Sequence, residues 1–335
     1  MLIVGSLLPD ALETYYYSYL MKRDISVSFF DSSSYYNVQS IKEKFYFRYF
    51  PGLLFNRVND ALLQRIQQDP PDIVWIFKGI EFFPQTLKSI AEKGIKLINY
   101  NPDHPFIRTF VSNGGSNVEE CVPFYDAHFC YSRDLMKKVQ SEYKLKSYWL
   151  PFGYNLADEE YRLLQGEKEE KRVCFIGNPD RLRALTARKI AEKGYEIDVY
   201  GYNWKQYLSP NHKIRIFDQV IGMDYWKTLR RYRIQLNIFR PHNVNSHNMR
   251  TFEIPACGGI QVAPFSDENV LFFEDGKEIF LFRNDDELIA IVDSLLRLSD
   301  IEATQIRKAS RYKVLQDHCS YEDRAHYVHD LLQNL

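Results

Sequence analysis

Apolar runs alternate with helical segments along most of this 335-residue chain. The predicted strands "MLIVG", "DIVWIF" and "IKLINY" are apolar at nearly every position rather than at every second one. Strands of this kind are buried on both faces, and the helical segments between them supply the cover. The chain is therefore predicted to form an α/β fold built on doubly wound parallel sheets.

The alternation occurs twice, on either side of the charged stretch "NLADEEYRLLQGEKEEKR" at 155–172. A chain of this length is too long for one ordinary core and suits two domains. We expect a Rossmann-like domain at residues 1–155 and a second at 156–335 that ends in terminal helices, and we interpret the charged stretch as their junction. If the two sheets face each other, the cleft between them would bind a ligand at the carboxyl ends of the strands.

The charge balance and the cysteines narrow the class of protein. Lys and Arg number 43 against 44 Asp and Glu, and this near-neutral balance does not favour nucleic acid as a partner. The five cysteines are odd in number and lack CxxC spacing, which indicates reduced thiols in a reducing compartment. The start "MLIVGSLLPDALE" lacks the basic region of a signal peptide, and no apolar run approaches the roughly 18 residues of a membrane span. We expect a cytoplasmic enzyme without a transmembrane segment.

The loop "IGNPDRLRA" follows a predicted strand and precedes a predicted helix. Gly177 would end the strand, and the free N–H groups at the start of the helix suit a phosphate. Arg181 and Arg183 could add charge-assisted contacts. Because the full GxGxxG pattern is absent, a plain strand-to-helix turn with surface arginines explains the loop about equally well.

A more specific pattern is the segment "LNIFRPHNVNSHNMRTFEIPACGGIQV". A predicted strand at Arg233–Phe239 is followed by Arg240 and by a loop rich in His and Asn, which contains Asn245 and Asn248. Loops at strand ends carry ligands in doubly wound domains. Arg240, Asn245 and Asn248 are therefore candidate binding residues.

The short helix expected after this loop would carry Arg250 and Glu253. Pro255 is tolerated only near a helix start, which places Glu253 in the first turn. A carboxylate there can accept both hydroxyls of a ribose, and Arg250 could neutralise a diphosphate. Gly258 and Gly259 would end the helix. The alternative is that Glu253 only complements the helix dipole and that Arg250 is a surface residue.

The first half offers two weaker candidates. In "INYNPDHPF", Asp103 and His104 follow a predicted strand; Asp103 could accept a proton from an acceptor hydroxyl, and His104 could bind a sugar hydroxyl or a phosphate. The alternative is an Asx turn stiffened by two prolines. In "VGSLLPD", Gly5 and Ser6 lie in the first strand-to-helix loop and could line the cleft.

The sequence shows no pattern typical of a metal centre. His242 and His247 lie among asparagines, without a nearby acid or cysteine pair, which is a poor arrangement for zinc. The acids of "NDDE" at Asn284–Glu287 are interpreted as part of a helix cap. We expect neither a bound metal nor another cofactor.

The segment "MRTFEIPACGGIQV" resembles the donor-binding segment of GT-B glycosyltransferases, and it is most similar to the CgeB-like, spore-maturation-type branch of the group-1 transferases. The likeness extends to "FIGN", "LRRYRIQLNIFR", "EIFLF", "DDEL" and "HCSYEDRAHYV" in the second half, and more faintly to "INYNPDHPF" in the first. It implies two Rossmann-like domains facing across a cleft, with Glu253 on the donor ribose and Arg250 near the diphosphate. Retaining relatives often carry a second Glu eight residues before the position of Glu253, where this chain has Asn245.

The resemblance implies a hexosyltransferase-like enzyme that moves a sugar from a nucleotide diphosphate sugar to an acceptor hydroxyl. It suggests a retaining, metal-independent reaction in polysaccharide or glycoconjugate synthesis, with a sugar, a lipid-linked molecule or a protein as acceptor. Arg181, Arg250 and backbone N–H groups would stabilise the leaving diphosphate. The alternatives are a nucleotide-sugar epimerase of the same fold, a non-catalytic nucleotide- or sugar-binding protein, and an assembly partner that uses the aromatic-rich first domain.

Overall fold

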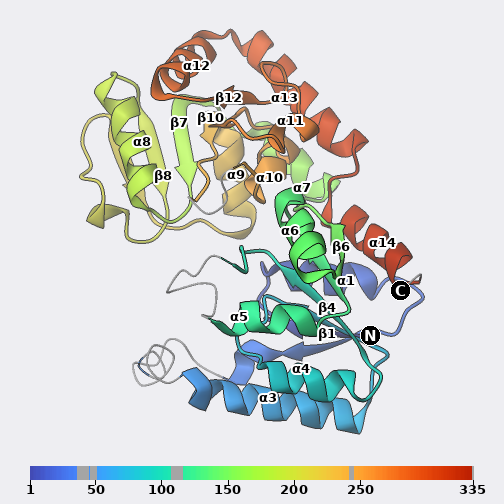
Figure 1. Cartoon of the computed structure of the whole chain (residues 1–335). Helices are drawn as coiled ribbons and strands as arrows, with labels where there is room; N and C mark the ends of the chain where they lie inside the picture. The colour runs from blue at the N-terminus through green and yellow to red at the C-terminus, as the bar shows by residue number, and fades with distance from the viewer. Residues whose placement is uncertain (36–44, 46–50, 107–115, 241–244, 334–335) are drawn as a thin grey trace. The chain divides into compact units, whose positions relative to one another are not determined.

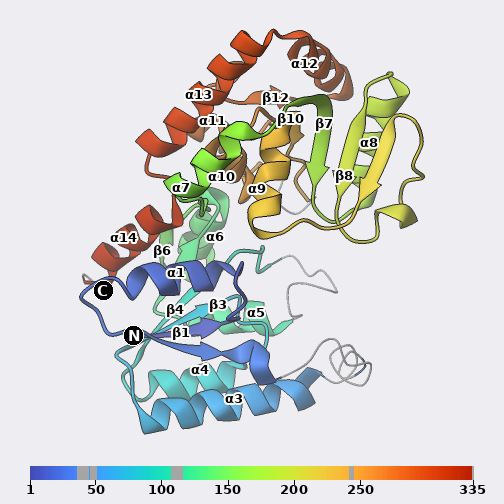
Figure 2. The same cartoon turned by 180° about the vertical axis from the view of Figure 1, so that it is seen from behind.

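The computed structural model describes residues 1–35, 45, 51–106, 116–240 and 245–333. The chain divides into two compact units, one formed by Met1–Pro151 with Tyr321–Leu335 and the other by Phe152–Ser320. Figures 1 and 2 show their elements. The last helix, α14 (Tyr321–Leu332), thus belongs to the first unit, whereas the sequence analysis assigned it to the second domain. It packs against α1 (Leu12–Leu20), where the rings of Tyr15 and Tyr321 stack with centroids 5.1 Å apart.

The first unit is built on a six-stranded sheet in the order β2-β1-β3-β4-β5-β6, and every strand pair is parallel. Its strands are β1 (Leu2–Gly5), β2 (Ser28–Asp31), β3 (Ile73–Phe77), β4 (Lys96–Asn101), β5 (Ala127–Cys130) and β6 (Lys146–Trp149). Besides α1 and α14, its helices are α3 (Pro51–Gln68), α4 (Pro84–Ala91), α5 (Ser116–Cys121) and α6 (Arg133–Tyr143).

Both faces of this sheet are buried, as the apolar strands predict. On β3, Val74 and Ile76 belong to the aliphatic core that packs under α3 and α4, which Figure 1 shows together on one side of the sheet. Trp75 and Phe77 alternate with them and contact Tyr16 of α1, with ring centroids 5.1 and 5.7 Å apart. These aromatic side chains therefore fill a core between the sheet and α1.

The second unit has its own parallel six-stranded sheet, in the order β12-β11-β10-β7-β8-β9. Its strands are β7 (Glu170–Ile176), β8 (Ile197–Tyr200), β9 (Ile214–Phe217), β10 (Tyr232–Leu236), β11 (Gln261–Pro264) and β12 (Phe280–Phe282). Its helices are α7 (Asp158–Leu163), α8 (Arg181–Glu192), α9 (Gly222–Arg231), α10 (Arg250–Ala256), α11 (Asn269–Phe272), α12 (Asp285–Arg297) and α13 (Asp300–Gln316). The predicted cap of α12 is confirmed, because the Asn284 side chain accepts a hydrogen bond from the Glu287 N–H at 2.9 Å.

The charged stretch at 155–172 begins close to the boundary between the two units at Pro151 and Phe152, but it is not a solvated linker. It forms α7 and the start of β7, and two of its acids, Asp158 and Glu169, pair with buried arginines of the second unit. Glu169 forms ion pairs with Arg233 of β10 and Arg307 of α13, and both arginines are buried. The composition suggested a linker because charge runs are usually exposed, and the partners of Glu169 lie more than 60 residues away along the chain.

None of the helices formed by the described residues combines the length and the apolar character needed to cross a membrane.

Candidate functional site

The strand order of the second unit fixes where a ligand would bind. The sheet begins in its middle with β7; β8 and β9 follow on one side of it, and β10 to β12 lie on the other. The loops that leave β7 and β10 therefore diverge, and open α/β sheets bind ligands in the crevice formed at such a point. Gly177 follows β7 and Arg240 lies four residues beyond β10, so both predicted residues flank this switch point.

Gly177 is held tightly by the neighbouring strand end. Its N–H donates to the Tyr200 carbonyl at 2.8 Å, and its own carbonyl accepts from Trp204 Nε1 at 2.9 Å. Its φ of 154° and the φ of 147° at Gly201 lie in the region that favours glycine. A Cβ on Gly201 would collide with the Gly177 backbone, and one on Gly177 would lie 3.6 Å from Nη2 of Arg250. The loop after β7 thus lies directly beside the Arg250 guanidinium.

Arg183 connects the two loops of the switch point. It is buried on α8, and its Nε and Nη2 donate to the Ile238 carbonyl beyond β10 at 3.1 and 2.9 Å. Its Nη1 donates to the Asn178 carbonyl beyond β7 at 2.9 Å. Arg183 therefore positions both loops, whereas Arg181, the arginine that we expected at the phosphate, is exposed on the first residue of α8.

Positive charge gathers at this point. Burial lowers the pKa of the Arg183 guanidinium, and the neighbouring charges of Arg250 and Arg240 add to this effect against the opposing charge of Asp180, so that the pKa falls to about 10. Nε of Arg250 is buried and has no hydrogen-bond partner within the described parts of the chain. An orphaned buried donor costs about 1–3 kcal/mol, so a ligand that accepts from it would recover that cost. We name Arg183, Arg240 and Arg250 the arginine cluster.

The start of α8 is partly occupied already. The Asp180 side chain caps the helix by accepting from the Arg183 N–H at 2.9 Å. One of the free N–H groups that we expected to bind a phosphate is therefore used internally. This leaves the backbone beside Gly177 and the arginine cluster as the stronger anion-binding features.

Helix α10 begins at Arg250, so the expectation that Pro255 lies near its start is wrong. Pro255 is the penultimate residue of this seven-residue helix, where it removes one helical hydrogen bond. Glu253 is nevertheless in the first turn, as expected. The end is a Schellman motif: Gly258, with φ 72°, donates to the Pro255 carbonyl at 2.9 Å, and Gly259 donates to Ile254 at 2.7 Å.

The other end of α10 is fixed by two arginines that sequence reasoning missed. Arg307 and Arg311, one turn apart on α13, donate to the Gly258 and Ala256 carbonyls. Both arginines are buried, and they neutralise the negative C-terminal end of α10. They thereby help to hold its N-terminal end, where Arg250 lies, at the switch point. The i,i+4 spacing of two arginines on an otherwise amphipathic helix was the available signal.

Glu253 is oriented by a tyrosine. The Tyr225 hydroxyl on α9 donates to Glu253 Oε2 at 2.6 Å. Burial, followed by the negative charge of Glu253, raises the pKa of Tyr225 well above its usual value, so the phenol remains a donor. The Tyr225 bond therefore helps to fix the orientation of a carboxylate, a group that offers about four acceptor positions.

The predicted asparagines have structural partners. Asn248 accepts from the Thr251 N–H at 3.2 Å and donates to Asn237 Oδ1 at 2.8 Å, which ties the start of α10 to the end of β10. Asn245, with φ 64°, donates to Asp267 Oδ2 at 3.0 Å and accepts from the Asp267 N–H at 2.9 Å. These bonds hold the loop before α10 against the loop after β11.

His247 is a buried core histidine. Its Nε2 accepts from the Phe152 N–H at 3.1 Å, so Nδ1 carries the proton and donates to Glu268 at 2.6 Å. His242 lies outside the described residues. Among the residues that are described, no three His, Cys, Asp or Glu side chains are grouped so as to hold a metal ion.

In the first unit the switch point lies between β1 and β3, because β2 extends the sheet on one side and β4 to β6 extend it on the other. Gly5 and Ser6 follow β1, and Lys78, with φ 57°, follows β3. Lys78 Nζ forms an ion pair with Asp103 Oδ2 at 3.0 Å. The structure thus brings the Lys78 side of this switch point and Asp103 together.

The turn at Asp103 and His104 has the geometry of the alternative that we considered. The Asp103 N–H donates to Asn101 Oδ1 at 3.0 Å, which is an Asx turn. His104 Nδ1 accepts from the Phe106 N–H at 3.3 Å. The turn aims the Asp103 carboxylate at Lys78 and does not consume it, so a chemical role for Asp103 remains a prediction.

Two buried acids beside this point were not identified from the sequence. Glu13 of α1 accepts from the Ser6 N–H at 2.7 Å, and Glu81 is bonded by Ser32 Oγ. Burial raises the pKa of both acids, and Lys78 opposes the shift at each. An acid on the buried face of the first helix was the signal that could have found Glu13.

Comparison with known proteins agrees with this architecture. Residues 181–330 match a family model described as "Glycosyl transferase-like", and no curated protein matches the chain in sequence. Sucrose-phosphate synthase from Thermosynechococcus elongatus has a similar structure, with a TM-score of 0.74 and 10% identity over 99% of this chain and 98% of that one. A UDP-forming α,α-trehalose-phosphate synthase from Burkholderia xenovorans gives a TM-score of 0.67 and 11% identity, with 98% of both chains covered.

A UDP-GlcNAc 2-epimerase from Neisseria meningitidis, solved with UDP-GlcNAc bound, gives a TM-score of 0.61 and 12% identity over 100% of this chain and 99% of that one. At these identities the likeness concerns the fold. The chain therefore has the GT-B fold with its two Rossmann-like units, as the sequence predicted, and the part of it that matches a glycosyl transferase-like model contains the arginine cluster and Glu253.

Proposed function

We propose that the protein is a glycosyltransferase that takes a sugar from a nucleotide diphosphate sugar. The observation that carries the proposal is the arginine cluster at the switch point of the second unit, with the orphaned Nε of Arg250 beside Gly177. Three guanidinium groups that repel one another in the free protein form a site for a ligand of concentrated negative charge, and a diphosphate is such a ligand.

The remaining donor residues fit around that diphosphate. Glu253 lies three residues beyond Arg250 on α10 and is oriented by Tyr225, so it is suited to accept the ribose hydroxyls. The Gly177 backbone approaches closely because neither it nor Gly201 carries a side chain. Arg240 is exposed on the other loop of the crevice. Asn245 and Asn248 act mainly by holding the loop before α10.

In this proposal, catalysis is electrostatic. When the bond between the sugar and the diphosphate breaks, negative charge grows on the leaving phosphate, and fixed guanidinium groups stabilise it without reorganising. The acceptor hydroxyl would be bound by the first unit, near Gly5, Ser6 and the Lys78–Asp103 pair, where Asp103 or His104 can assist its deprotonation or positioning. We propose a retaining, metal-independent hexosyl transfer, in line with the motif resemblance to the CgeB-like branch.

The two synthase structures and the epimerase structure named above suggest which nucleotide to test first. One is described as UDP-forming and another was solved with UDP-GlcNAc, so uridine diphosphate is the first choice. The proposed setting is glycoconjugate or polysaccharide synthesis inside the cell.

The test begins with binding and continues with turnover. Thermal unfolding is followed with UDP, GDP, ADP and their glucose and N-acetylglucosamine conjugates; a ligand at 100 times its Kd stabilises by about 2.7 kcal/mol. The stabilising conjugate is then incubated with candidate acceptors, and the products are separated. A glycosylated acceptor supports transfer, and an epimerised donor indicates the same-fold epimerase. Binding without any product indicates a binding protein, and absence of stabilisation by every nucleotide contradicts the proposal.

A further inference from the structure

His247 connects the loop before α10 to the point where the chain enters the second unit. Phe152 is the first residue of that unit, and its N–H donates to His247 Nε2 at 3.1 Å. Two residues earlier, the Leu150 N–H donates to the Cys130 carbonyl of the first unit at 2.8 Å. Pro151 alone therefore separates a backbone group bonded within the first unit from the group that His247 holds.

The segment by which the chain leaves the second unit lies beside this entry point. The Tyr154 N–H donates to the Cys319 carbonyl at 3.3 Å, and Tyr154 forms a bridge with Ser320. Ser320 is the last residue of the second unit, and the chain returns to the first unit at Tyr321. The chain thus crosses between the units at two points that are adjacent in the second unit.

The other nitrogen of His247 is fixed to the loop that follows β11. Nδ1 donates to Glu268 Oε2 at 2.6 Å, and Ser246 Oγ donates to the same oxygen at 2.8 Å. His247, Ser246 and Glu268 are all buried. A neutral imidazole has one donor and one acceptor nitrogen on a rigid ring, so one side chain joins the Phe152 backbone to the loop after β11.

The same ring packs against the helix that carries Arg250. It meets Phe252 of α10 edge to face, with centroids 5.5 Å apart, and Arg250 lies three residues beyond His247. Phe272 of α11 and Phe152 also pack against the ring, with centroids 5.0 and 5.6 Å away. A close-packed interior transmits displacements because its side chains have few voids to move into. A shift of α10 would therefore displace the imidazole.

We propose that His247 is a positioning residue that couples occupancy of the donor site to the entry segment of the second unit, residues 152–154. In the free protein the guanidinium groups of the arginine cluster repel one another, and a diphosphate bound to Arg250 would hold the start of α10 in one place. The bond between His247 and the Phe152 N–H would then open more rarely. The inference rests on the proposed function, because it requires a nucleotide at the arginine cluster.

Two substitutions separate the two bonds of His247. His247→Asn places an amide near the position of Nδ1, which can still donate to Glu268 but does not reach Phe152. His247→Gln places its amide near the position of Nε2, which can still accept from the Phe152 N–H. Both variants lose the packing of the ring, so a difference between them does not come from packing alone.

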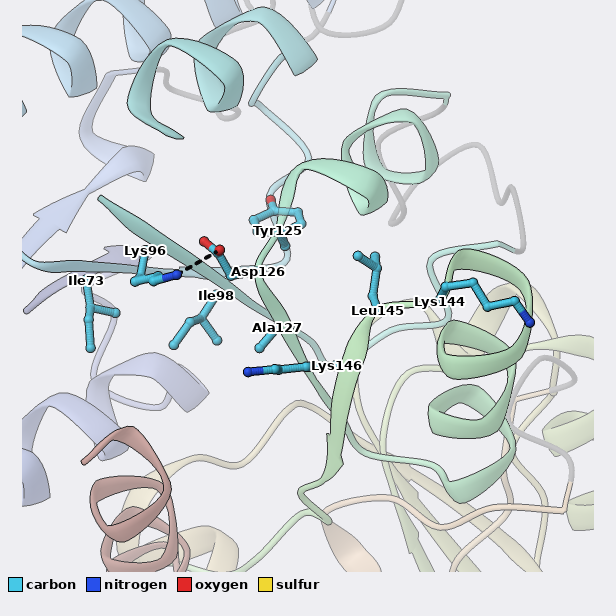
Figure 3. A pocket seen from close by; sticks show the side chains of 9 residues that line it. All are labelled: Ile73, Lys96, Ile98, Tyr125, Asp126, Ala127, Lys144, Leu145 and Lys146. Atoms are coloured by element: carbon cyan, nitrogen blue, oxygen red, sulfur yellow. Dashed lines mark hydrogen bonds and ion pairs between the residues drawn. The ribbon is translucent and has the colours of Figure 1, made fainter. Parts of the chain in front are cut away.

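A control substitution is available in the first unit. Figure 3 shows Lys96 at the edge of a hollow there, beside Asp126. The two side chains pair at 3.4 Å and are well exposed, so the pair contributes little to stability. Lys96→Gln should leave both the exchange of the Phe152 amide and the affinity for nucleotide as in the wild type.

Hydrogen exchange of the Phe152 amide, followed by NMR in the full-length protein, measures the coupling. Saturating UDP should slow this exchange by about fivefold or more in the wild type and in His247→Gln, the lower end of typical coupling between two sites. In His247→Asn the amide should exchange fast with and without UDP. Because coupling is reciprocal, His247→Asn should also raise the Kd for UDP by about fivefold in calorimetry.

Arg250→Met is a second variant that leaves His247 and its bonds unchanged. When UDP is supplied at the same multiple of each protein's Kd, the stabilisation of the whole unit is equal in the variant and the wild type. The slowing at Phe152 should nevertheless be smaller in Arg250→Met, because the ligand no longer holds the start of α10. This comparison decides the question if His247→Asn does not fold.

Three outcomes would overturn the coupling. Equal slowing at Phe152 in the wild type and in either His247→Asn or Arg250→Met would show that UDP acts only through the stability of the whole unit. Binding of UDP without any slowing in the wild type would overturn the coupling while the proposed donor site stands. If neither UDP nor any other nucleotide binds in calorimetry or in thermal unfolding, the proposed function fails and the coupling fails with it.

Discussion

Arg250 offers a test in which ligand affinity and protein stability move differently. Arg250→Met removes the guanidinium but keeps an unbranched side chain of similar reach. If Arg250 donates to the diphosphate, its loss removes a charge-assisted hydrogen bond worth about 1.5–3 kcal/mol. The Kd for the nucleotide diphosphate should therefore rise by about 10- to 150-fold.

The ligand-free protein should not lose stability through the same change. Nε of Arg250 is buried without a hydrogen-bond partner among the described residues, so the methionine removes an unsatisfied donor that costs about 1–3 kcal/mol. It also removes a positive charge that lowers the pKa of Arg183. The free energy of unfolding without ligand should thus remain level or rise, as at other sites where function costs stability.

Calorimetric titration with UDP and urea unfolding without ligand measure the two quantities. Arg188→Met on the exposed side of α8 is the matched control, because it removes one positive charge from the same unit outside the crevice. It should leave the Kd within about twofold of the wild-type value. The reasoning fails if Arg250→Met binds the nucleotide as tightly as this control does, or if it lowers the free energy of unfolding by more than about 2 kcal/mol.

Three further changes probe the rest of the proposed site. Glu253→Ala should weaken nucleotide binding by about 1–3 kcal/mol while the fold survives, and an unchanged affinity in calorimetry would remove the ribose role. Turnover should persist in excess EDTA; its loss on chelation and recovery with magnesium or manganese would contradict a metal-independent reaction. Asp103→Asn or His104→Ala should reduce turnover by about 10²–10⁴-fold in at least one case, with nucleotide affinity nearly unchanged. Wild-type rates in both variants would show that the turn at Asp103 and His104 has only a structural role.

The sheets were predictable because strands that are buried on both faces are apolar at nearly every position. A strand such as "IVWIF" is apolar at every position since Val74 and Ile76 face one helical layer while Trp75 faces the other. The same holds for helix ends, where Asn284 and the Gly258–Gly259 pair act through neighbours within a few residues. Patterns that involve only residues close together in the sequence can be recognised without knowledge of the fold.

Long-range partners were not predictable in the same way. The return of α14 to the first unit depends on contacts between residues about 300 positions apart, such as Tyr15 and Tyr321. Whether Arg181 or Arg183 lies at the switch point depends on which side of α8 faces the end of β10. Both arginines satisfy the sequence pattern equally, and only the packing of the helix decides that one is buried and the other exposed.

The charged stretch beside the boundary between the units allows a direct test of what Glu169 does. Its carboxylate pairs with the buried Arg233 and Arg307, which also donate to backbone carbonyls. Glu169→Gln should therefore lower the free energy of unfolding of the second unit by about 3 kcal/mol, the lower end of the cost of breaking a buried pair. The adjacent Glu170 pairs with Arg215 at 2.8 Å in a more exposed position, so Glu170→Gln should cost less than about 1 kcal/mol.

The ion pairs of Glu169 also predict that the stability of the second unit depends on pH. Burial alone would raise the pKa of Glu169, but the hydrogen bonds and charges of Arg233 and Arg307 outweigh it and hold that pKa below the ordinary value of 4.5. A carboxyl whose pKa is lower in the folded state stabilises the fold fully above 4.5 and loses this contribution as the pH falls through the folded value. The difference in unfolding free energy between wild type and Glu169→Gln should thus be constant near neutral pH and shrink below about pH 4.5. Hydrogen exchange at the amides of β10 and α13 measures it in the intact chain. A difference that stays the same down to pH 3, or an equal loss in Glu170→Gln, would show that the carboxylate of Glu169 does not hold these two arginines in place.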